Sequence, residues 1–245
     1  MKEKKKRVFV SWSGGKESCL ACYKALKSGF KVTRLLNFLA EDGKRERAHG
    51  LRSSLLRLQS EAVGIPIFQV NASWEGYESK FKQAVAELKK DGRGKEGKEG
   101  KEGKEGVGVE AGGVGVEAGV FGDIDLAEHR EWVERVCSEL EIEPILPLWG
   151  LKPEAALREF VEAGFEAVVV ATRVREEWLG RRVDESFIEE LRQFDFHLCG
   201  ESGEYHTFVV DGPIFKRRVK LGVGDAERRE VGENWFLDIK EAELE

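Results

Sequence analysis

A run of small residues followed by a lysine lies near the start of the chain and has the composition of a phosphate-binding loop. The run Ser-Gly-Gly-Lys follows the apolar residues 8–10 and precedes a segment with helical spacing. At such a strand-to-helix junction, backbone N–H groups and the helix dipole face an anion, and a lysine adds positive charge. A glycine turn with a solvated lysine is the alternative, but the flanking serines favour the phosphate site. The residues expected around the phosphates are Ser11, Ser13, Gly14, Gly15, Lys16, Glu17 and Ser18.

This loop differs from the Walker pattern, because Glu17 follows Lys16 where that pattern has Ser or Thr. Residues 13–18 instead resemble the S-G-G-x-D-S signature of the N-type ATP pyrophosphatases, the PP-loop family. The resemblance implies ATP as cofactor, cleaved between its α and β phosphates while an acceptor oxygen is adenylated. Glu17 replaces the Asp of the signature and keeps a carboxylate. Mg²⁺ is implied as well, held through the phosphates and by Glu17 or Asp123.

A second motif lies far along the chain, at residues 200–207 (GESGEYHT). It is similar to the G-E-x-G-E-[FY]-x-T motif of the diphthine–ammonia ligase family, and residues 122–124, 147–149 and 178–181 follow family motifs in the same order. The resemblance implies an ATP-dependent carbon–nitrogen ligase. Its partners would be diphthine-bearing translation elongation factor 2, whose carboxylate is adenylated, and ammonium, which then gives diphthamide, AMP and pyrophosphate.

The two glutamates of the second motif, Glu201 and Glu204, are expected to line the acceptor pocket. There they would bind the trimethylammonium group of diphthine, bind ammonium or accept its proton; a solvated acidic turn is the alternative. The expected catalytic residues are Lys16, Glu201 and Glu204. The expected substrate-binding residues are His49, Gly200, Glu201, Gly203, Glu204, His206 and Thr207.

Two histidines and one aspartate complete the expected site. His49 follows a predicted strand where family members also carry a histidine, and a capping histidine is the alternative. His206 stands where diphthine enzymes often have Glu, which resembles a prokaryotic branch of the family. Asp123, with Gly122 in the ATP site, ends a predicted central strand and would contact magnesium or ribose; a turn aspartate is the alternative.

Strands and helices alternate in the part of the chain that would position the loop. Apolar runs predict strands at 8–12, 31–39, 67–70 and 116–121, and amphipathic spacing predicts helices at 16–28, 49–63, 77–90 and 127–140. This alternation is typical of a doubly wound, mostly parallel α/β sheet, which by resemblance would be adenine nucleotide alpha hydrolase-like. Helices at 153–163 and 184–194 with strands at 165–171, 208–210 and 213–221 predict a smaller α+β subdomain.

The domain boundaries follow from these patterns. Residues 7–145 would form the ATP-binding domain, 146–222 the substrate subdomain and 223–245 a C-terminal tail, because the last residues hold little apolar periodicity. Residues 95–106 are four copies of Lys-Glu-Gly. Glycine at every third position cannot sustain a helix and alternating charge leaves nothing to bury, so we expect a disordered insertion at about 91–113.

Composition excludes several classes of protein. A net charge of −6 disfavours a general DNA or RNA binder, which needs a basic face. No apolar stretch approaches the roughly 20 residues of a membrane span, so we expect a cytoplasmic protein. The four cysteines lack the spacing of a metal site and are expected to be buried thiols.

Two other functions stay open at this point. The first is a PP-loop enzyme that modifies tRNA or another carboxylate or carbonyl acceptor, against which the acidic balance and the absence of a catalytic cysteine pair weigh. The second is a non-catalytic ATP or AMP sensor, which would not require the acidic loop at Glu201 and Glu204. The oligomeric state stays open too.

Overall fold

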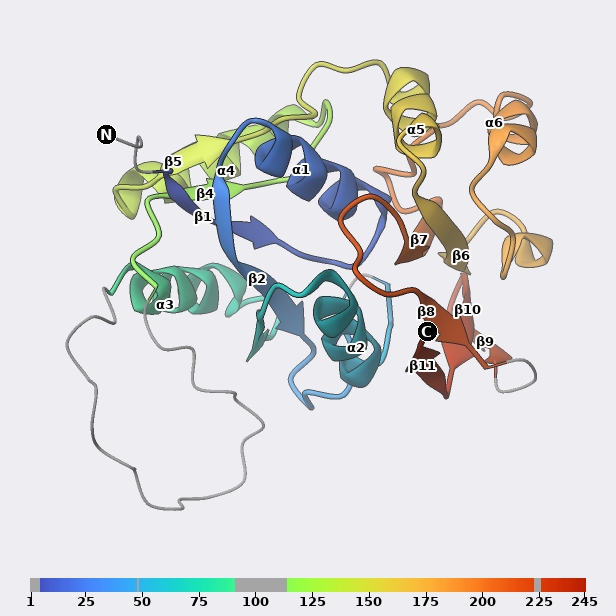
Figure 1. Cartoon of the computed structure of the whole chain (residues 1–245). Helices are drawn as coiled ribbons and strands as arrows, with labels where there is room; N and C mark the ends of the chain where they lie inside the picture. Colours follow the sequence, from blue (N-terminus) through green and yellow to red (C-terminus); the bar gives the residue numbers. More distant parts are fainter. Residues whose placement is uncertain (1–4, 48, 91–113, 223–225) are drawn as a thin grey trace.

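Five parallel strands form the sheet of the N-terminal half. The structure, a computed structural model, describes residues 5–47, 49–90, 114–222 and 226–245, and the predicted insertion at 91–113 lies outside the described residues. The strands are β1 (Arg7–Ser11), β2 (Lys31–Leu39), β3 (Ile67–Asn71), β4 (Ala118–Val120) and β5 (Glu143–Ile145). Their order is β3-β2-β1-β4-β5 and all neighbours are parallel (Figure 1). The predicted doubly wound sheet is confirmed, and its order reverses beside β1, where such sheets bind ligands.

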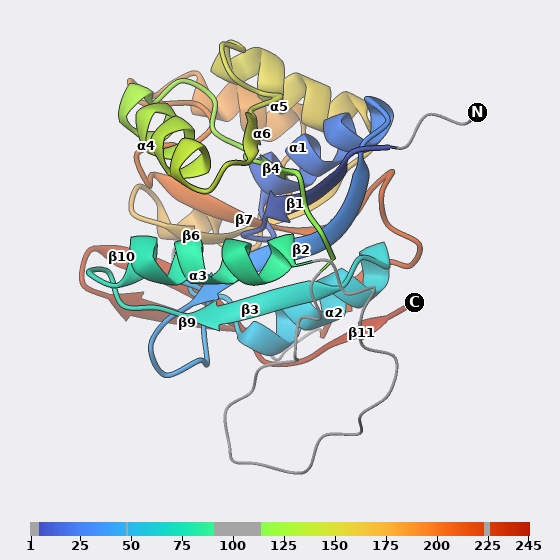
Figure 2. The same cartoon turned by 90° about the vertical axis from the view of Figure 1, so that its left-hand side faces the viewer.

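Helices cover both faces of this sheet, because successive residues of a strand point to opposite sides. In β1, Val8 and Val10 share a core with α1 (Lys16–Lys27) and α2 (Ser53–Val63). Phe9 shares another core with α3 (Tyr77–Lys89) and α4 (Ala127–Glu139) (Figures 1 and 2).

The start of α2 differs from the sequence pattern, which predicted a helix from residue 49. The helix begins at Ser53, and the chain before it turns back on itself with a β-bridge between Arg45 and Arg52. His49 therefore lies in a loop at the carboxyl end of β2, where its side chain can reach the phosphate loop.

A separate antiparallel sheet follows, with the order β7-β6-β10-β9, and confirms the predicted α+β region. Its elements and those around it are α5 (Pro153–Glu162), β6 (Glu166–Thr172), the 3₁₀ helix η2 (Glu176–Trp178), α6 (Glu185–Leu191), β7 (Tyr205–Asp211), β8 (Val219–Leu221), β9 (Ala226–Val231), β10 (Asn234–Ile239) and β11 (Ala242–Leu244). The strand predicted at 213–221 is thus limited to its last residues.

The prediction of a C-terminal tail at 223–245 is wrong for the described part of that segment. β9 and β10 form a hairpin, and β10 joins β6 through pairs of Trp235 with Thr172 and of Phe236 with Ala171. β11 pairs with β8. Backbone groups make these pairs, and the outer strands face water on one or both sides, so the sequence shows little apolar alternation there.

The two sheets are joined through α1 and the loop before it. One continuous apolar core contains residues of β1, α1 and α2 together with residues of α5, β6 and β7. The backbone N–H of Val209 donates to the carbonyl oxygen of Gly14 at 3.0 Å, and the Gln59 amide donates to the carbonyls of both residues. These contacts fix β7 against the phosphate loop.

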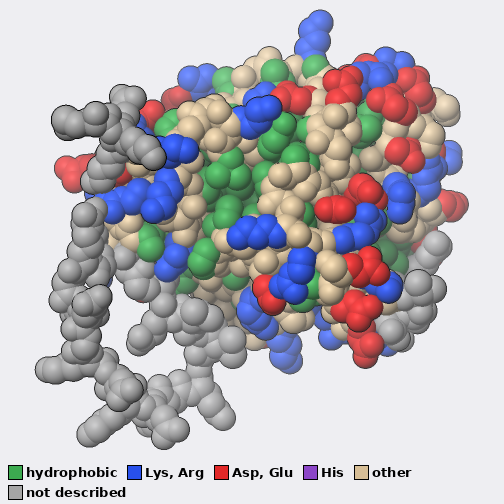
Figure 3. Space-filling view, viewed as in Figure 1, with side chains coloured by type: hydrophobic (Ala, Val, Ile, Leu, Met, Phe, Trp, Pro, Cys, Tyr) green, Lys and Arg blue, Asp and Glu red, His purple; other side chains and the backbone are tan. Residues whose placement is uncertain are grey.

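The surface and the cysteines agree with the composition. Basic and acidic side chains are interspersed on the face shown in Figure 3. All four cysteines are free and buried, as predicted. Among the described residues, no helix has the length and apolar character needed to cross a membrane.

Candidate active site

The phosphate loop requires glycine at Gly14 because of its backbone and its neighbours. Gly14 has a φ of +81°, which side chains rarely adopt, and a Cβ there would lie 2.5 Å from Leu56. A Cβ at Gly15 would lie 3.1 Å from Nε2 of His49 and 3.2 Å from the carbonyl oxygen of Thr207. The loop is therefore packed closely between α2, the His49 loop and β7.

Side-chain oxygens occupy two backbone donors of this loop. The N–H of Gly15 donates to Oγ of Ser13 at 3.3 Å, and the N–H of Lys16 donates to Oγ1 of Thr207 at 3.1 Å. These two N–H groups thus point at oxygen atoms. Phosphate oxygens could replace the two hydroxyl oxygens as acceptors.

Lys16 keeps its positive charge although it is buried. Its Nζ donates to the carbonyl oxygen of Cys199 at 2.7 Å, lies 2.7 Å from Oε1 of Glu17 and stands 4.4 Å from the ring centre of Tyr205. Burial opposes the charged form most strongly, but the Glu17 carboxylate together with Tyr205 and Cys199 outweighs it and raises the pKa of Lys16 above its ordinary value. The lysine is a fixed cation between the phosphate loop and the second motif.

A cavity of about 340 Å³ opens beside Lys16 and brings together most of the predicted site. The predicted residues that line it are Ser11, Ser13, Lys16, Glu17, Ser18, His49, Gly122, Asp123, Gly200, Glu201 and His206. The cavity is also lined by His129, Cys199 and Tyr205, which the sequence interpretation missed.

Five predicted residues, Gly14, Gly15, Gly203, Glu204 and Thr207, are absent from that lining. Gly14, Gly15 and Thr207 act through the loop contacts described above. Glu204 is buried, with one carboxylate oxygen lacking a hydrogen-bond partner among the described residues, and its carbonyl oxygen accepts from Thr172 and Arg173.

Acidic groups and one histidine gather on one side of the cavity. Nδ1 of His129 lies 3.1 Å from Oδ1 of Asp123, and single ligand atoms of Asp123, His129 and Glu201 all lie within 4.8 Å of one another. Burial and the nearby Glu17 raise the pKa of Glu201 to about 8, and the hydrogen bond to Asp123 raises the pKa of His129. This side of the cavity favours a cation.

His197 holds the loop that presents Cys199 and Glu201. Its Nδ1 accepts from the backbone N–H groups of both residues, at 3.2 and 3.4 Å, while Nε2 lies 3.1 Å from each carboxylate oxygen of Asp125. The sequence interpretation missed His197 and Asp125, because neither stands in a motif.

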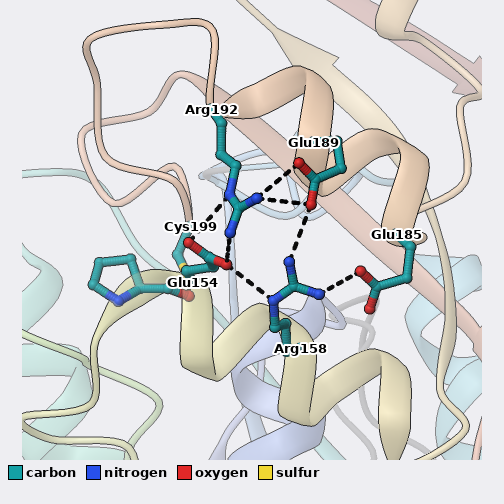
Figure 4. A network of polar contacts seen from close by, with 7 residues as sticks. Glu154, Arg158, Glu185, Glu189, Arg192 and Cys199 are labelled. Atoms are coloured by element: carbon teal, nitrogen blue, oxygen red, sulfur yellow. Dashed lines mark hydrogen bonds and ion pairs between the residues drawn. The ribbon is translucent and has the colours of Figure 1, made fainter.

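Cys199 is also fixed from the side of α5 and α6. Its Sγ donates to the carbonyl oxygen of Pro153, at the start of α5. Figure 4 shows how Arg158 and Arg192 join the two helices through Glu154, Glu185 and Glu189. The carbonyl that accepts from Lys16 is therefore held by two helices rather than by a free loop.

A second cavity of about 380 Å³ adjoins the first and is largely aromatic. Its lining comprises Ser11, Tyr77, Phe121, Asp123, His129, Trp132 and Val133, of which Ser11, Asp123 and His129 also line the first cavity. A planar, mostly apolar group could therefore lie next to an anion held by the phosphate loop.

Two family models match the chain. "Diphthamide synthase N-terminal domain" matches residues 6–144 and "Diphthamide synthase C-terminal domain" matches residues 152–244. A solved structure described as a predicted subunit of tRNA methyltransferase from Methanocaldococcus jannaschii covers 85% of this chain, but at 13% identity and a TM-score of 0.44 this likeness is weak.

Curated relatives named diphthine–ammonia ligase are similar over most of the chain. The protein of Rattus norvegicus is 27% identical over 236 residues, which cover 90% of this chain and 84% of the relative. The Homo sapiens protein is 26% identical over 87% of this chain and 82% of its own length. The Schizosaccharomyces pombe protein is 28% identical over 96% of this chain but only 39% of its own length. These names confirm the prediction of a ligase, and the two matching models show that the chain belongs to the diphthamide synthase family.

Proposed function

We propose that this protein adenylates the carboxylate of diphthine on translation elongation factor 2 with ATP and then amidates it with ammonium. The products would be diphthamide, AMP and pyrophosphate. Elongation factor 2 as the substrate would place the enzyme in the cytoplasm.

The observation that carries this proposal is the way Lys16 joins the phosphate loop to the second motif, with contacts that span 191 residues to Thr207 and 183 residues to Cys199, which directly precedes the motif. Its backbone N–H bonds to Thr207 and its ammonium group bonds to the carbonyl oxygen of Cys199. Adenylation of a carboxylate requires the phosphates and the acceptor to meet at one point, because the acceptor oxygen must attack the α phosphorus. A charged lysine at the junction supports that reaction.

The linings of the two adjoining cavities suit the two ends of ATP. Its phosphates would lie against Lys16 and the serines of the loop, and its base would lie among Tyr77, Phe121 and Trp132 in the aromatic cavity. When the carboxylate attacks the α phosphorus, the bond to the β-phosphate oxygen breaks and negative charge grows on pyrophosphate. The ammonium group of Lys16 stabilises that charge in a buried site.

The residues of the cavity also suit Mg²⁺. The carboxylates of Asp123 and Glu201 approach each other beside Glu17, and carboxylate oxygens are ligands that Mg²⁺ prefers. Asp123 and Glu201 would hold the ion, with Glu17 close by. When bound, the ion neutralises charge on the phosphates.

Product analysis tests the proposed reaction. The chain is incubated with ATP labelled on the α phosphate, Mg²⁺, ammonium and diphthine-bearing elongation factor, and labelled AMP and the amide are measured. A Lys16→Ala variant should lose product formation by at least ~100-fold, as expected when a preorganised charge is removed. Lys27→Ala, which removes a lysine from the other end of α1, is the matched control and should stay close to wild type.

Several results would contradict the proposal. ADP in place of AMP would place cleavage at the wrong bond, and absence of turnover with the elongation factor would exclude the substrate. AMP formed with tRNA alone would favour the tRNA-modifying alternative. Full turnover by Lys16→Ala would remove the phosphate loop from the mechanism.

A further inference from the structure

Two histidines from distant parts of the chain meet in the cavity beside the phosphate loop. His49 comes from the loop after β2 and His206 from β7, and their ring centres lie 4.5 Å apart with the rings nearly perpendicular. Both line the 340 Å³ cavity that also contains Lys16 and Glu201. ATP binding alone does not require such a pair, since the loop and Lys16 already provide the donors for phosphate.

A buried glutamate orients one of these histidines. Oε2 of Glu46 accepts a hydrogen bond from the backbone N–H of His49 at 2.5 Å and lies 3.1 Å from its Nδ1. Because a carboxylate only accepts, Nδ1 carries the hydrogen and Nε2 is left as the acceptor. Nε2 faces the phosphate loop, where it lies 3.1 Å from the position of a Cβ on Gly15.

His206, the second histidine of the pair, is neutral. Burial lowers its pKa well below the ordinary histidine value, and His49, Lys16 and Arg173 act in the same direction. Glu46 lies on the side of His49, and Lys16 and Arg173 act on His206; the other titratable groups of the cavity lining include Glu17, Asp123, His129 and Glu201. His49 is the ring of the pair that lies against the carboxylate of Glu46.

We propose that His49, oriented by Glu46 and packed against His206, is the base that takes a proton from ammonium in the amidation step. This role rests on the proposed function, and in it Glu46 is a positioning residue. One proton passes from ammonium to Nε2 of His49, and the resulting ammonia attacks the carbonyl carbon of the acyl-adenylate. The C–O bond to AMP then breaks, its electron pair stays on the AMP phosphate, and the nitrogen releases a second proton to water.

A comparison of two nucleophiles separates this role from a structural one. At pH 7 ammonia is almost entirely protonated, whereas hydroxylamine is mostly neutral and needs no base before it attacks. Amide and hydroxamate formation are measured on the same elongation-factor substrate, and the ratio of the two rates is compared within each variant. ATP–pyrophosphate exchange is measured in parallel to follow adenylation alone.

Three variants give the expected results. His49→Gln should lower the ratio of amide to hydroxamate formation by at least ~100-fold, the usual contribution of a general base. Glu46→Gln, which keeps the size of the side chain and removes its charge, should lower the ratio by roughly 10-fold. The control is Glu61→Gln, the same change at an exposed glutamate of α2 that pairs with Arg217 and does not line the cavity, and it should leave the ratio unchanged.

The outcomes distinguish the two proposals. A wild-type protein without pyrophosphate exchange or any product would refute the proposed function and this role with it. Pyrophosphate exchange and amide formation in the wild type, with His49→Gln slowing both nucleophiles equally, would refute the base alone. An equal fall of the ratio in Glu61→Gln would also refute it, because a change outside the cavity would then have the same effect.

Discussion

Asp238 of β10 holds the loop that carries His49, and replacing it by asparagine is the sharpest test of how the C-terminal strands support the site. Its carboxylate accepts from Arg45 at 2.9 Å and from Arg52 at 3.0 and 2.9 Å. Arg45 also donates to the carbonyl oxygen of Gly50. The carboxylate thus closes both ends of the turn at residues 45–52, and Asp238→Asn keeps its shape while removing the charge.

The magnitude follows from the pKa of this carboxyl group. Hydrogen bonds from Arg52 and then Arg45, opposed by burial, lower the pKa of Asp238 from 3.8 to about 2. Its side chain is only 11% exposed, so little solvent screening applies. A drop of this size corresponds to about 2 kcal/mol of folding free energy at neutral pH. Because the folded pKa is lowered, this contribution is complete above pH ~4 and is lost as the pH falls toward 2.

Urea unfolding of wild type and Asp238→Asn at several pH values measures this effect. The variant should be less stable by about 2 kcal/mol at pH 7, and the difference should shrink steadily between pH 4 and pH 2. Other carboxylates titrate in the same range, but their effects cancel in the difference between the two proteins. Glu241→Gln, an exposed change in the same C-terminal segment, is the control and should show no such difference. A difference that is independent of pH would refute the ion-pair explanation.

Three further predictions concern the phosphate loop and the two cavities. Gly14→Ala should lower the free energy of unfolding by about 2–5 kcal/mol, because a positive φ costs ~1–2 and the clash with Leu56 costs ~1–3 kcal/mol; a loss below ~1 kcal/mol in denaturant unfolding would contradict the loop geometry. The pKa of Glu201 is raised to about 8, so wild type should lose stability relative to Glu201→Gln as the pH rises from ~4.5 to 8. Thermal or urea unfolding across this pH range measures the difference in stability. A difference that does not change with pH would contradict the raised pKa. Trp132→Ala should raise the dissociation constant for ATP by roughly 10-fold in calorimetry, as expected for the loss of stacking on the base, and unchanged affinity would move the base out of the aromatic cavity.

The sequence was most informative where local physics determines structure. Apolar runs and amphipathic spacing located four of the five strands of the parallel sheet, since buried strands and helices between them leave strong patterns. Gly14 was found because small residues at a strand-to-helix junction indicate a phosphate loop, and the structure adds that its φ is positive. The hairpin of β9 and β10 was missed, because β9 is mostly polar and the apolar residues of β10, among them Trp235 and Phe236 that pair with β6, stand in one run without alternation.

The site shows the same division between local and long-range determinants. Lys16, Asp123 and Glu201 could be named because each stands in a motif, whereas His129, Asp125 and His197 could not. The contacts of these three depend on how β4, α4 and the chain before β7 come together. His197, for example, reaches Asp125 across 72 residues of sequence. No periodicity in a single segment carries that information.

The carboxylates of the site illustrate how a motif can be right as a whole while its members differ in role. Glu201 and Glu204 were expected to act together, but only Glu201 lines the cavity. Glu204 directly precedes β7, where its carbonyl oxygen is bound by Thr172 and Arg173, and its side chain is buried. Glu46, which the sequence did not single out, instead brings a carboxylate to His49 from the opposite side. An acidic side chain beside the phosphate loop repels the phosphates unless a cation or another group lies between them, and a bound Mg²⁺ would serve in this way for Glu17, Asp123 and Glu201. For Glu46 the imidazole of His49 lies between, so that the ring rather than a carboxylate faces the reacting atoms.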